Sequence, residues 1–421
     1  MKLPGFLRSR LSKRLVTSTA YAALLLFFLL IWNRLGIHLV LSETFAKTVH
    51  LGNALVRQDE KLPFKNSELL FIDFSERLQL VENADCTANY PIASRPVLTK
   101  LLDTLEKNGM SDSYVICDLY FDNRSDDDLM LEKEIAKFPN FFSTEFDDKN
   151  FKIKPNVFKV GLSAPAGFEI KTESLAGLSQ AELSYGLVYG HATPTLPLAI
   201  FQHYNNARIE YHDFYYRADN RYFLKTVEID PYIETGDLDE AAYDHDSQHN
   251  NISDREIDYF KIDTLLKDLS YSDLNKKLAQ KKIIVIGNFK EDTHNTIAGD
   301  LPGPLVVFNI FLSLQGNANQ VTLAGTSVLF LVFISLVYTE LFLKHKRLYK
   351  SYHRSLRNLS GHLALNISLN VLLAWVASLL SYYLINSSLD VIVGASLLSA
   401  IGYINRNAIK LKHRIKSAQQ R

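Results

Sequence analysis

The stretches SELLFIDF at residues 67–74, YVICDLY at 114–120 and KIIVIGNF at 282–289 decide the fold of this 421-residue chain. Each is a short, almost continuous run of apolar residues, with a polar residue at or near its end. Strands with one wet face alternate apolar and polar residues, whereas strands covered on both faces do not. The three runs therefore predict strands at the centre of a sheet that is covered on both sides.

Helix signals separate these strands, which indicates parallel pairing. Pro96–Lys107 begins with a proline, which suits the first turn of a helix, and stops before Asn108 and Gly109. The remaining predicted elements are a helix at Asp126–Lys137, a strand at Phe141–Phe146, a helix at Ile262–Gln280 and a helix at Pro304–Leu314 that enters a membrane span. Because strand–helix–strand units join parallel strands through right-handed crossovers, we predict an α/β fold with a mostly parallel sheet flanked by helices.

The middle of the chain carries weaker signals. Arg208–Arg217 and Arg221–Ile229 alternate aromatic and polar residues on either side of a short polar turn, which predicts a β-hairpin. Gly236–Asp258 is acidic and poor in large apolar residues, so we predict a mobile loop there. This loop contains the tract Asp244–His249, which resembles a metal-binding tract but is better explained as a solvated charge run.

Charge is strongly segregated along the chain, although Lys plus Arg and Asp plus Glu both total 46. Residues 1–14, 344–357 and 405–421 together contain 17 Lys and Arg and no Asp or Glu. The rest of the chain is therefore acidic, which excludes nucleic acid as a partner of the central region. The composition also excludes collagen, a disordered tail and a disulfide-rich toxin.

Apolar runs adjoin the basic blocks and predict four transmembrane helices. A hydrocarbon core of about 30 Å needs roughly 20 apolar residues. The predicted spans are 15–41 (an uncleaved signal anchor), 321–343, 363–385 and 389–404. Basic loops stay on the cytoplasmic side, so we expect a cytoplasmic N-terminus at 1–14, a cytoplasmic loop at 344–362 and a cytoplasmic tail at 405–421. Residues 42–320 are then an extracytoplasmic domain of a multi-pass protein of the plasma (inner) membrane.

Small and polar residues recur in the last two spans. Asn370, Ser378 and Ser381 lie on one, and Ala395 and Ser399 lie four residues apart on the other. Such residues let helices approach closely and hydrogen-bond in lipid. Packing within one bundle explains them, and a contact face for a membrane partner is the alternative.

Polar residues cluster where the predicted strands end, and ligands of open parallel sheets bind beyond that edge. The candidate ligand-binding residues are Asp73, Ser75, Glu76, Asp118, Asp122, Asn288, Asp292 and His294, with Asp300 just after them. Their oxygens suit a divalent cation such as calcium or magnesium, the one cofactor that we consider. The alternative is that these residues cap helices and fix turns. We assign no catalytic residues, because no motif of a known catalytic class is present.

Only two cysteines occur, Cys86 and Cys117, so a zinc ribbon or a CxxC redox pair is excluded. Both fall in the predicted extracytoplasmic domain, where a disulfide can form. The alternative is that Cys117, which lies in the middle of a predicted strand, is a buried small apolar residue.

The order of these features resembles the CHASE sensory domain of the second type, an extracellular module that accompanies bacterial adenylate cyclases, histidine kinases and serine/threonine kinases. The resemblance covers about residues 15–404. The residues that carry it are a strand ending in IDFS, Pro91 and Arg95 before a helix, a strand ending at Asp118, KIIVIGNF followed by Asp292 and Thr296, Pro302 and Gly303 opening a helix that contains Asn309, and one plus three membrane spans. The tryptophan usual before Arg95 is absent, and His294 is unexpected, so no ligand is carried over from the family.

The resemblance implies a sensor, and we expect a 17-residue tail in place of a cytoplasmic output domain. We therefore predict a non-enzymatic, membrane-anchored extracytoplasmic receptor. It would bind an unknown ligand or an exported partner and pass its state through its membrane helices to a separate signalling protein. The expected partners are membrane lipid, that signalling or envelope protein and a second copy of the chain in a homo-oligomer. The alternative is a structural subunit of a cell-envelope complex.

Overall fold

The computed structural model divides the chain into two compact units, which are described separately. The α/β unit comprises Asn53–Ile170 and Glu182–Ala318, and the helical unit comprises Met1–Gly52, Lys171–Ala181 and Asn319–Arg421. The residues that the structure describes are 10–34, 63–82, 89–147, 153–166, 168–171, 182–190, 192–213, 215–229, 231–240, 257–268, 278–296, 299–343, 359–385 and 391–419.

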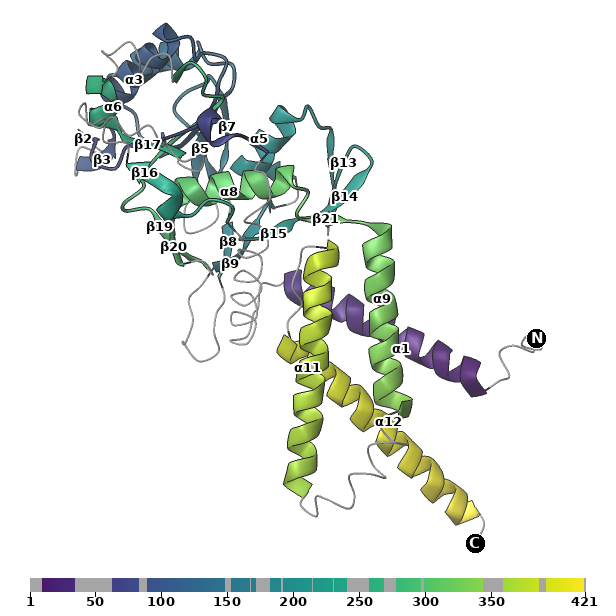
Figure 1. Ribbon diagram of the computed structural model, residues 1–421. Helices are drawn as coiled ribbons and strands as arrows, with labels where there is room; N and C mark the ends of the chain where they lie inside the picture. Colours follow the sequence, from purple (N-terminus) through teal and green to yellow (C-terminus); the bar gives the residue numbers. More distant parts are fainter. Residues whose placement is uncertain are drawn as a thin grey trace, which may run out of the picture. The chain divides into compact units, whose positions relative to one another are not determined.

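A mostly parallel sheet forms the centre of the α/β unit (Figure 1). Its strands, in spatial order, are β16 (Leu238–Glu240), β17 (Ile257–Lys261), β1 (Leu69–Asp73), β18 (Ile283–Gly287), β4 (Tyr114–Tyr120) and β5 (Phe141–Asp147). All of these neighbours pair in parallel. At the β5 edge, β7 (Leu162–Pro165) pairs in parallel and β6 (Ile153–Lys154) antiparallel. The predicted α/β class and the four predicted central strands are confirmed.

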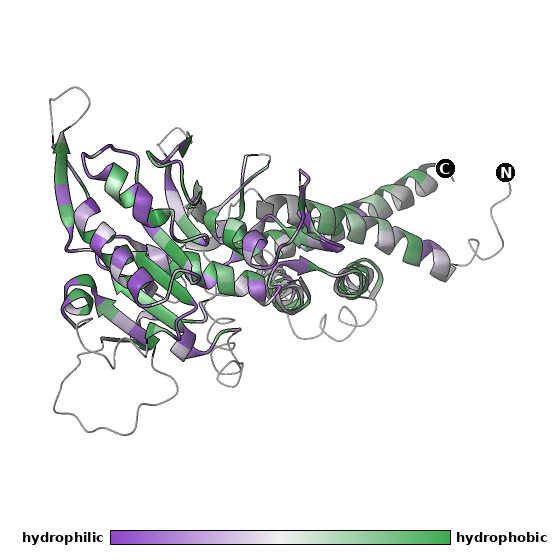
Figure 2. Cartoon of the chain, turned by 90° about the horizontal axis from the view of Figure 1, so that it is seen from above, coloured by the Kyte–Doolittle hydropathy of each residue, from purple (hydrophilic) through white to green (hydrophobic). Residues whose placement is uncertain are grey.

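Both faces of the sheet are buried, as the uninterrupted apolar runs predicted. All five residues of β1 and of β18 are buried. Leu70 and Ile72 pack into one apolar cluster, whereas Leu69 and Phe71 pack into another. This division follows from the alternation of side chains along a strand. Green, hydrophobic residues dominate the strands of the sheet in Figure 2.

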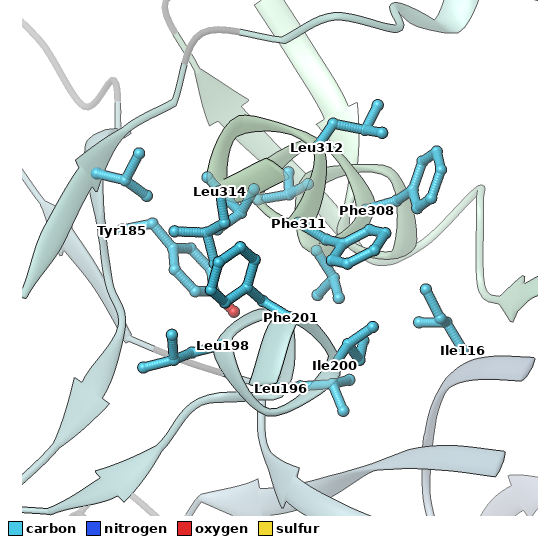
Figure 3. Close-up of a cluster of buried hydrophobic side chains, with 14 of the residues drawn as sticks. Ile116, Tyr185, Leu196, Leu198, Ile200, Phe201, Phe308, Phe311, Leu312 and Leu314 are labelled. Atoms are coloured by element: carbon cyan, nitrogen blue, oxygen red, sulfur yellow. The ribbon is translucent and has the colours of Figure 1, made fainter. Parts of the chain in front are cut away.

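Helices cover both faces. The cluster around Leu70 and Ile72 includes side chains of α3 (Arg95–Lys107), α4 (Asp128–Ile135) and α6 (Ile262–Asp268). The opposite cluster includes α5 (Leu196–Tyr204) and α8 (Gly303–Gln315), whose Phe201 and Phe311 lie among the apolar side chains in Figure 3. The α/β unit is therefore a sheet between two helical layers.

Helix α8 corrects one prediction. All residues from Gly303 to Leu314 are buried, so this helix lies inside the core. A helix that is covered on all sides carries apolar residues on all sides. It ends at Gln315, and Asn317 follows with a left-handed φ of 57°. A short strand, β21 (Gln320–Val321), then precedes the next helix. The prediction that Pro304–Leu314 enters the membrane span is wrong.

The predicted hairpin has more strands than expected. Each aromatic run is divided in two, giving β12 (Ile209–Tyr211), β13 (Tyr215–Ala218), β14 (Arg221–Leu224) and β15 (Thr226–Glu228). Strand β13 pairs antiparallel with both β12 and β14, and Asp219 turns the β13–β14 hairpin with a φ of 53°. Strand β15 pairs instead with β9 (Glu182–Gly186). Alternation along a run therefore did not reveal where the chain bends.

The predicted loop at Gly236–Asp258 is wrong at both ends. The 3-10 turn η3 (Thr235–Asp237) leads into β16, and β17 begins at Ile257. Residues 241–256, with the Asp244–His249 tract, lie outside the described residues, as do residues 269–277 of the predicted Ile262–Gln280 helix. The remaining elements are η2 (Asn66–Glu68), β2 (Leu78–Glu82), β3 (Asn89–Ala93), β8 (Phe168–Lys171), β10 (Val188–Tyr189), β11 (Thr193–Pro194), β19 (Thr293–Thr296) and β20 (Gly299–Pro302).

Four helices pack together in the helical unit. They are α1 (Arg10–Arg34), α9 (Leu323–Tyr338) with a π-helical last turn (Thr339–Leu343), α11 (Leu359–Ile385) and α12 (Val391–Gln419). One apolar cluster contains side chains from all four, including Leu25, Phe333, Ala377 and Leu398.

Polar contacts also join these helices. The Nδ2 group of Asn370 on α11 donates to Ser399 Oγ on α12 at 2.7 Å. The predicted packing of small and polar residues within one bundle is therefore confirmed for this pair. Helix α12 also continues to Gln419 through the predicted tail, so the expected end of the last span at residue 404 does not coincide with a helix end.

Among the described residues, one helical segment meets the length and composition of a membrane-spanning helix. Leu323–Phe342 is long and apolar enough to cross a membrane, and Asn370–Tyr382 and Val393–Asn405 are shorter apolar helices.

Candidate functional site

The carboxyl edge of the central sheet is the candidate site, because the connections on either side of β18 lead to opposite faces. The chain leaves β4 for α4 on one face and leaves β18 for α8 on the other. In open α/β sheets, ligands bind beyond the strand ends at such a reversal. The predicted site residues follow β1, β4 and β18, the strands around this point.

Two of the predicted residues fix turns. Asp73 is buried, and its Oδ1 accepts from the backbone N–H groups of Ser75 at 2.9 Å and Phe289 at 3.3 Å. Its Oδ2 accepts from the Tyr259 hydroxyl at 3.0 Å. Asn288 Oδ1 accepts from two backbone N–H groups that follow it in the chain. For Asp73 and Asn288, the turn-fixing alternative describes the observed contacts.

Three other predicted residues lie at the same strand ends without joining one cluster. Glu76 is exposed and forms an ion pair with Lys290. Asp122 Oδ1 accepts from the side-chain amide of Asn123 at 3.1 Å. Ser75 is buried, and its hydroxyl has no hydrogen-bond partner among the described residues. Asp300, which follows on β20, is exposed.

The structure brings Asp118, Asp292 and His294 together. Asp118 is buried near the end of β4, and its Oδ1 accepts from the Thr144 hydroxyl of β5 at 2.6 Å. His294 Nε2 lies 3.3 Å from Asp292 Oδ1. Burial, followed by repulsion from Asp292, raises the pKa of Asp118 to about 6, although Thr144 and His294 oppose the rise. A carboxyl group with this pKa exchanges its proton under mildly acidic conditions.

The first turn of α8 lies against this cluster. The Gly303 N–H donates to the Asp292 carbonyl oxygen at 2.7 Å. A Cβ atom on Gly303 would lie 2.1 Å from Asp292 Oδ2 and 3.2 Å from His294 Nε2, so a larger residue here would displace the Asp292 carboxylate. The Asp292 carboxylate therefore lies at the positive end of the helix dipole, where negative charge is favoured.

A second glycine keeps α8 close to the sheet. A Cβ atom on Gly287, the last residue of β18, would lie 2.2 Å from Pro304 Cγ and 3.3 Å from the Asp118 carbonyl oxygen. The close approach of helix and strand positions Asp118 and Asp292 relative to each other. The sequence shows both glycines but not this need for them.

The described part of the chain offers no ready set of ligands for the predicted divalent cation. Within the residues that the structure describes, no three His, Cys, Asp or Glu side chains are grouped so that they could hold a metal ion. The cation remains a prediction.

Arg95 is not among the predicted site residues, although it lies close to the end of β4. It is completely buried, and its guanidinium carbon lies 4.6 Å from the Phe121 ring centroid and 5.6 Å from that of Phe158. Its Nε donates to Asp128 Oδ1 at 3.2 Å, and its two NH2 groups donate to the carbonyl oxygens of Ala93 and Asn123. Burial lowers its pKa, and Asp128 opposes this. Arg95 therefore ties the start of α3 to the loop between β4 and α4.

Cys117 is a buried free thiol in β4, and its burial raises its pKa. This agrees with the alternative of a buried small apolar residue. Cys86 lies outside the described residues, so the predicted disulfide remains a prediction.

Comparisons with known proteins identify no relative, since no protein-family model, curated protein or solved structure matches the chain.

Proposed function

We propose that this chain is a membrane-anchored extracytoplasmic sensor that resembles CHASE domains of the second type. Its α/β unit binds a signal at the carboxyl edge of the sheet, and its helices pass the change to a separate protein. The helical unit spans the plasma membrane four times, with both termini in the cytoplasm. The proposal does not require an enzymatic activity in the α/β unit.

The observation that carries the proposal is the surface of α9. Only 28% of an 18-residue window within Leu323–Phe342 is buried, whereas the core helix of a soluble protein is mostly buried. Large apolar side chains point outward from α9 and from its neighbours, including Leu331, Phe27, Val376 and Tyr403. Lipid is the solvent in which such a surface is stable. Together with the three basic blocks, it supports a bundle in a membrane with its basic segments in the cytoplasm.

The acid–histidine cluster supports the sensing role. Asp118, whose pKa is raised by burial, and the Asp292–His294 pair lie against the first turn of α8. A ligand or proton bound there acts on α8, whose C-terminal end precedes α9 by a few residues in the chain. This gives a direct covalent route from the sheet edge to the first helix of the C-terminal bundle.

The topology is tested with single cysteines at exposed positions. Asp112→Cys lies in the α/β unit and Ile415→Cys lies on α12, in a background with Cys86→Ser and the buried Cys117 retained. A membrane-impermeant maleimide should label position 112 in intact cells and position 415 only after permeabilisation. The reverse pattern, or release of the protein by alkaline carbonate, refutes the proposal.

Exposed apolar side chains favour the alternative of a structural subunit that docks another exported protein. Leu80 on β2 and Leu129 on α4 are 70% and 71% exposed. Purification from crosslinked membranes should recover a cytoplasmic or membrane signalling partner for a sensor and an exported envelope protein for a scaffold. Small molecules should raise the melting temperature of a sensor only, because ligands stabilise the state that binds them.

A further inference from the structure

A hollow of about 660 Å³ opens beside the β4–α4 loop. Its wall comes from that loop, from α4 and from the segment 157–159, and includes Arg124, Asp126, Leu129, Glu132, Phe158 and Lys159. Its volume falls in the range of small-molecule sites in proteins. It follows the carboxyl end of β4, so it lies on the side of the sheet where ligands of α/β folds bind.

The base of the hollow is held in place by buried contacts. Asp128 in the wall accepts from the buried Arg95, and it also accepts from the Ser125 N–H at 2.9 Å. Phe158 faces the guanidinium group of Arg95 at 5.6 Å. The backbone N–H of Val157 donates to the Phe121 carbonyl oxygen at 2.8 Å. A wall supported in this way is ordered before a ligand arrives, which lowers the entropy lost on binding.

Charged side chains of both signs remain available around the hollow. Among the residues that the structure describes, the side chains of Arg124, Asp126 and Lys159 form no hydrogen bond or ion pair. Glu132 uses Oε1 to accept from the Lys159 N–H at 3.1 Å, which leaves its other oxygen for a ligand. Asp128 is already neutralised by Arg95. The lining therefore offers two cations and two anions beside apolar surface from Leu129 and Phe158.

We infer that this hollow binds a small zwitterion of the α-amino acid class with an apolar side chain. Arg124 and Lys159 hold the carboxylate, since guanidinium and ammonium groups pair strongly with it. Asp126 and Glu132 accept from the ammonium group, and the apolar side chain contacts Leu129 and Phe158. A simple anion would leave Asp126 and Glu132 without a partner, and a simple cation would leave Arg124 and Lys159 without one. None of Asp118, Asp292 and His294 lines the hollow, so it is a second ligand site of the proposed sensor, and the inference rests on that proposed function.

The test measures binding to the full-length protein in lipid nanodiscs by calorimetry. The probe is L-leucine, compared with 4-methylpentanoate, which lacks the amine, and isoamylamine, which lacks the carboxylate. We expect one saturable site for L-leucine and binding at least about tenfold weaker for either analogue, because each loses a charge-assisted pair. Arg124→Gln and Asp126→Asn should each weaken L-leucine binding by about tenfold or more.

Two variants serve as matched controls. Arg208→Gln and Asp112→Asn make the same chemical changes at exposed positions outside the hollow, and both should bind L-leucine as the unaltered protein does. No saturable binding of L-leucine, L-phenylalanine or L-methionine up to about 10 mM overturns the inference, since weaker binding than this is non-specific. Equal binding by Arg124→Gln, Asp126→Asn and the controls also overturns it. Alkaline carbonate is also applied to the membranes from which the protein is purified. If the protein stays in these membranes, the anchor is intact and a failure to bind concerns only the ligand.

Discussion

Replacing the buried Asp118 by asparagine should stabilise the protein at neutral pH. The pKa of this carboxyl group rises from its ordinary value of 3.8 to about 6, mainly because burial disfavours the charged form. The folded protein therefore holds a proton between these two pH values that the unfolded chain releases. Stability falls as pH rises through this window, and above about pH 6 the full penalty of a buried charge remains.

The magnitude follows from the two pKa values. Each tenfold change in acidity corresponds to about 1.4 kcal/mol, so the shift from 3.8 to about 6 costs about 3 kcal/mol above pH 6. Asparagine carries no charge and still accepts the Thr144 hydroxyl through its side-chain oxygen. Asp118→Asn should therefore gain up to about 3 kcal/mol at pH 8. For a unit of this size, that gain corresponds to a melting temperature roughly 6 °C higher.

The assay is thermal unfolding of the full-length protein in detergent, followed by tyrosine circular dichroism at several pH values from 4 to 8. The difference between Asp118→Asn and the unaltered protein should be largest at pH 8 and should shrink toward zero near pH 4. Thr144→Val, which removes the donor that favours ionised Asp118, should move the window to higher pH. A variant that is less stable at pH 8, or a difference that does not change with pH, refutes the reasoning.

Three further predictions concern packing. Gly287→Ala should destabilise the α/β unit by about 1–3 kcal/mol, because the new methyl group overlaps the proline at the start of α8. The control Gly236→Ala adds a methyl group where there is open space, so it should change the melting temperature little. Arg95→Lys should destabilise the α/β unit by about 2–4 kcal/mol, because lysine cannot replace the forked hydrogen bonds or the ring contacts. Urea unfolding measures this loss, and an unchanged midpoint contradicts the prediction. In a double-mutant cycle, Asn370→Ala and Ser399→Ala should show a coupling of about 0.6–1.7 kcal/mol in the stability of the bundle, and additive effects would exclude the hydrogen bond as a contributor.

The sequence alone was sufficient to place the central strands. Residues 69–73, 114–120 and 283–287 pair within the predicted runs because burial on both faces removes the alternation that a half-exposed strand must show. The start of α3 was predicted to within one residue because proline favours the first turn. Local patterns of this kind depend only on neighbouring residues.

Other features needed contacts between distant residues. The helix at 303–315 was predicted correctly as a helix, but only packing shows that its apolar surface meets the sheet and does not continue into a membrane span. The aromatic runs at 208–229 alternate throughout, yet the chain bends within both of them. Periodicity reports that a face is buried and does not report what covers it.

For the candidate site, the sequence determined which chemical groups lie at the strand ends, because strand ends follow from the local pattern. The tertiary structure alone decided what those groups do. It placed Asp73 in a turn, brought Asp118 together with Asp292 and His294, and buried Arg95 against two aromatic rings. These outcomes depend on how closely α8 approaches β18 and on the order in which the strands pair, and β18 pairs with β1 and β4, which lie more than a hundred residues away in the chain.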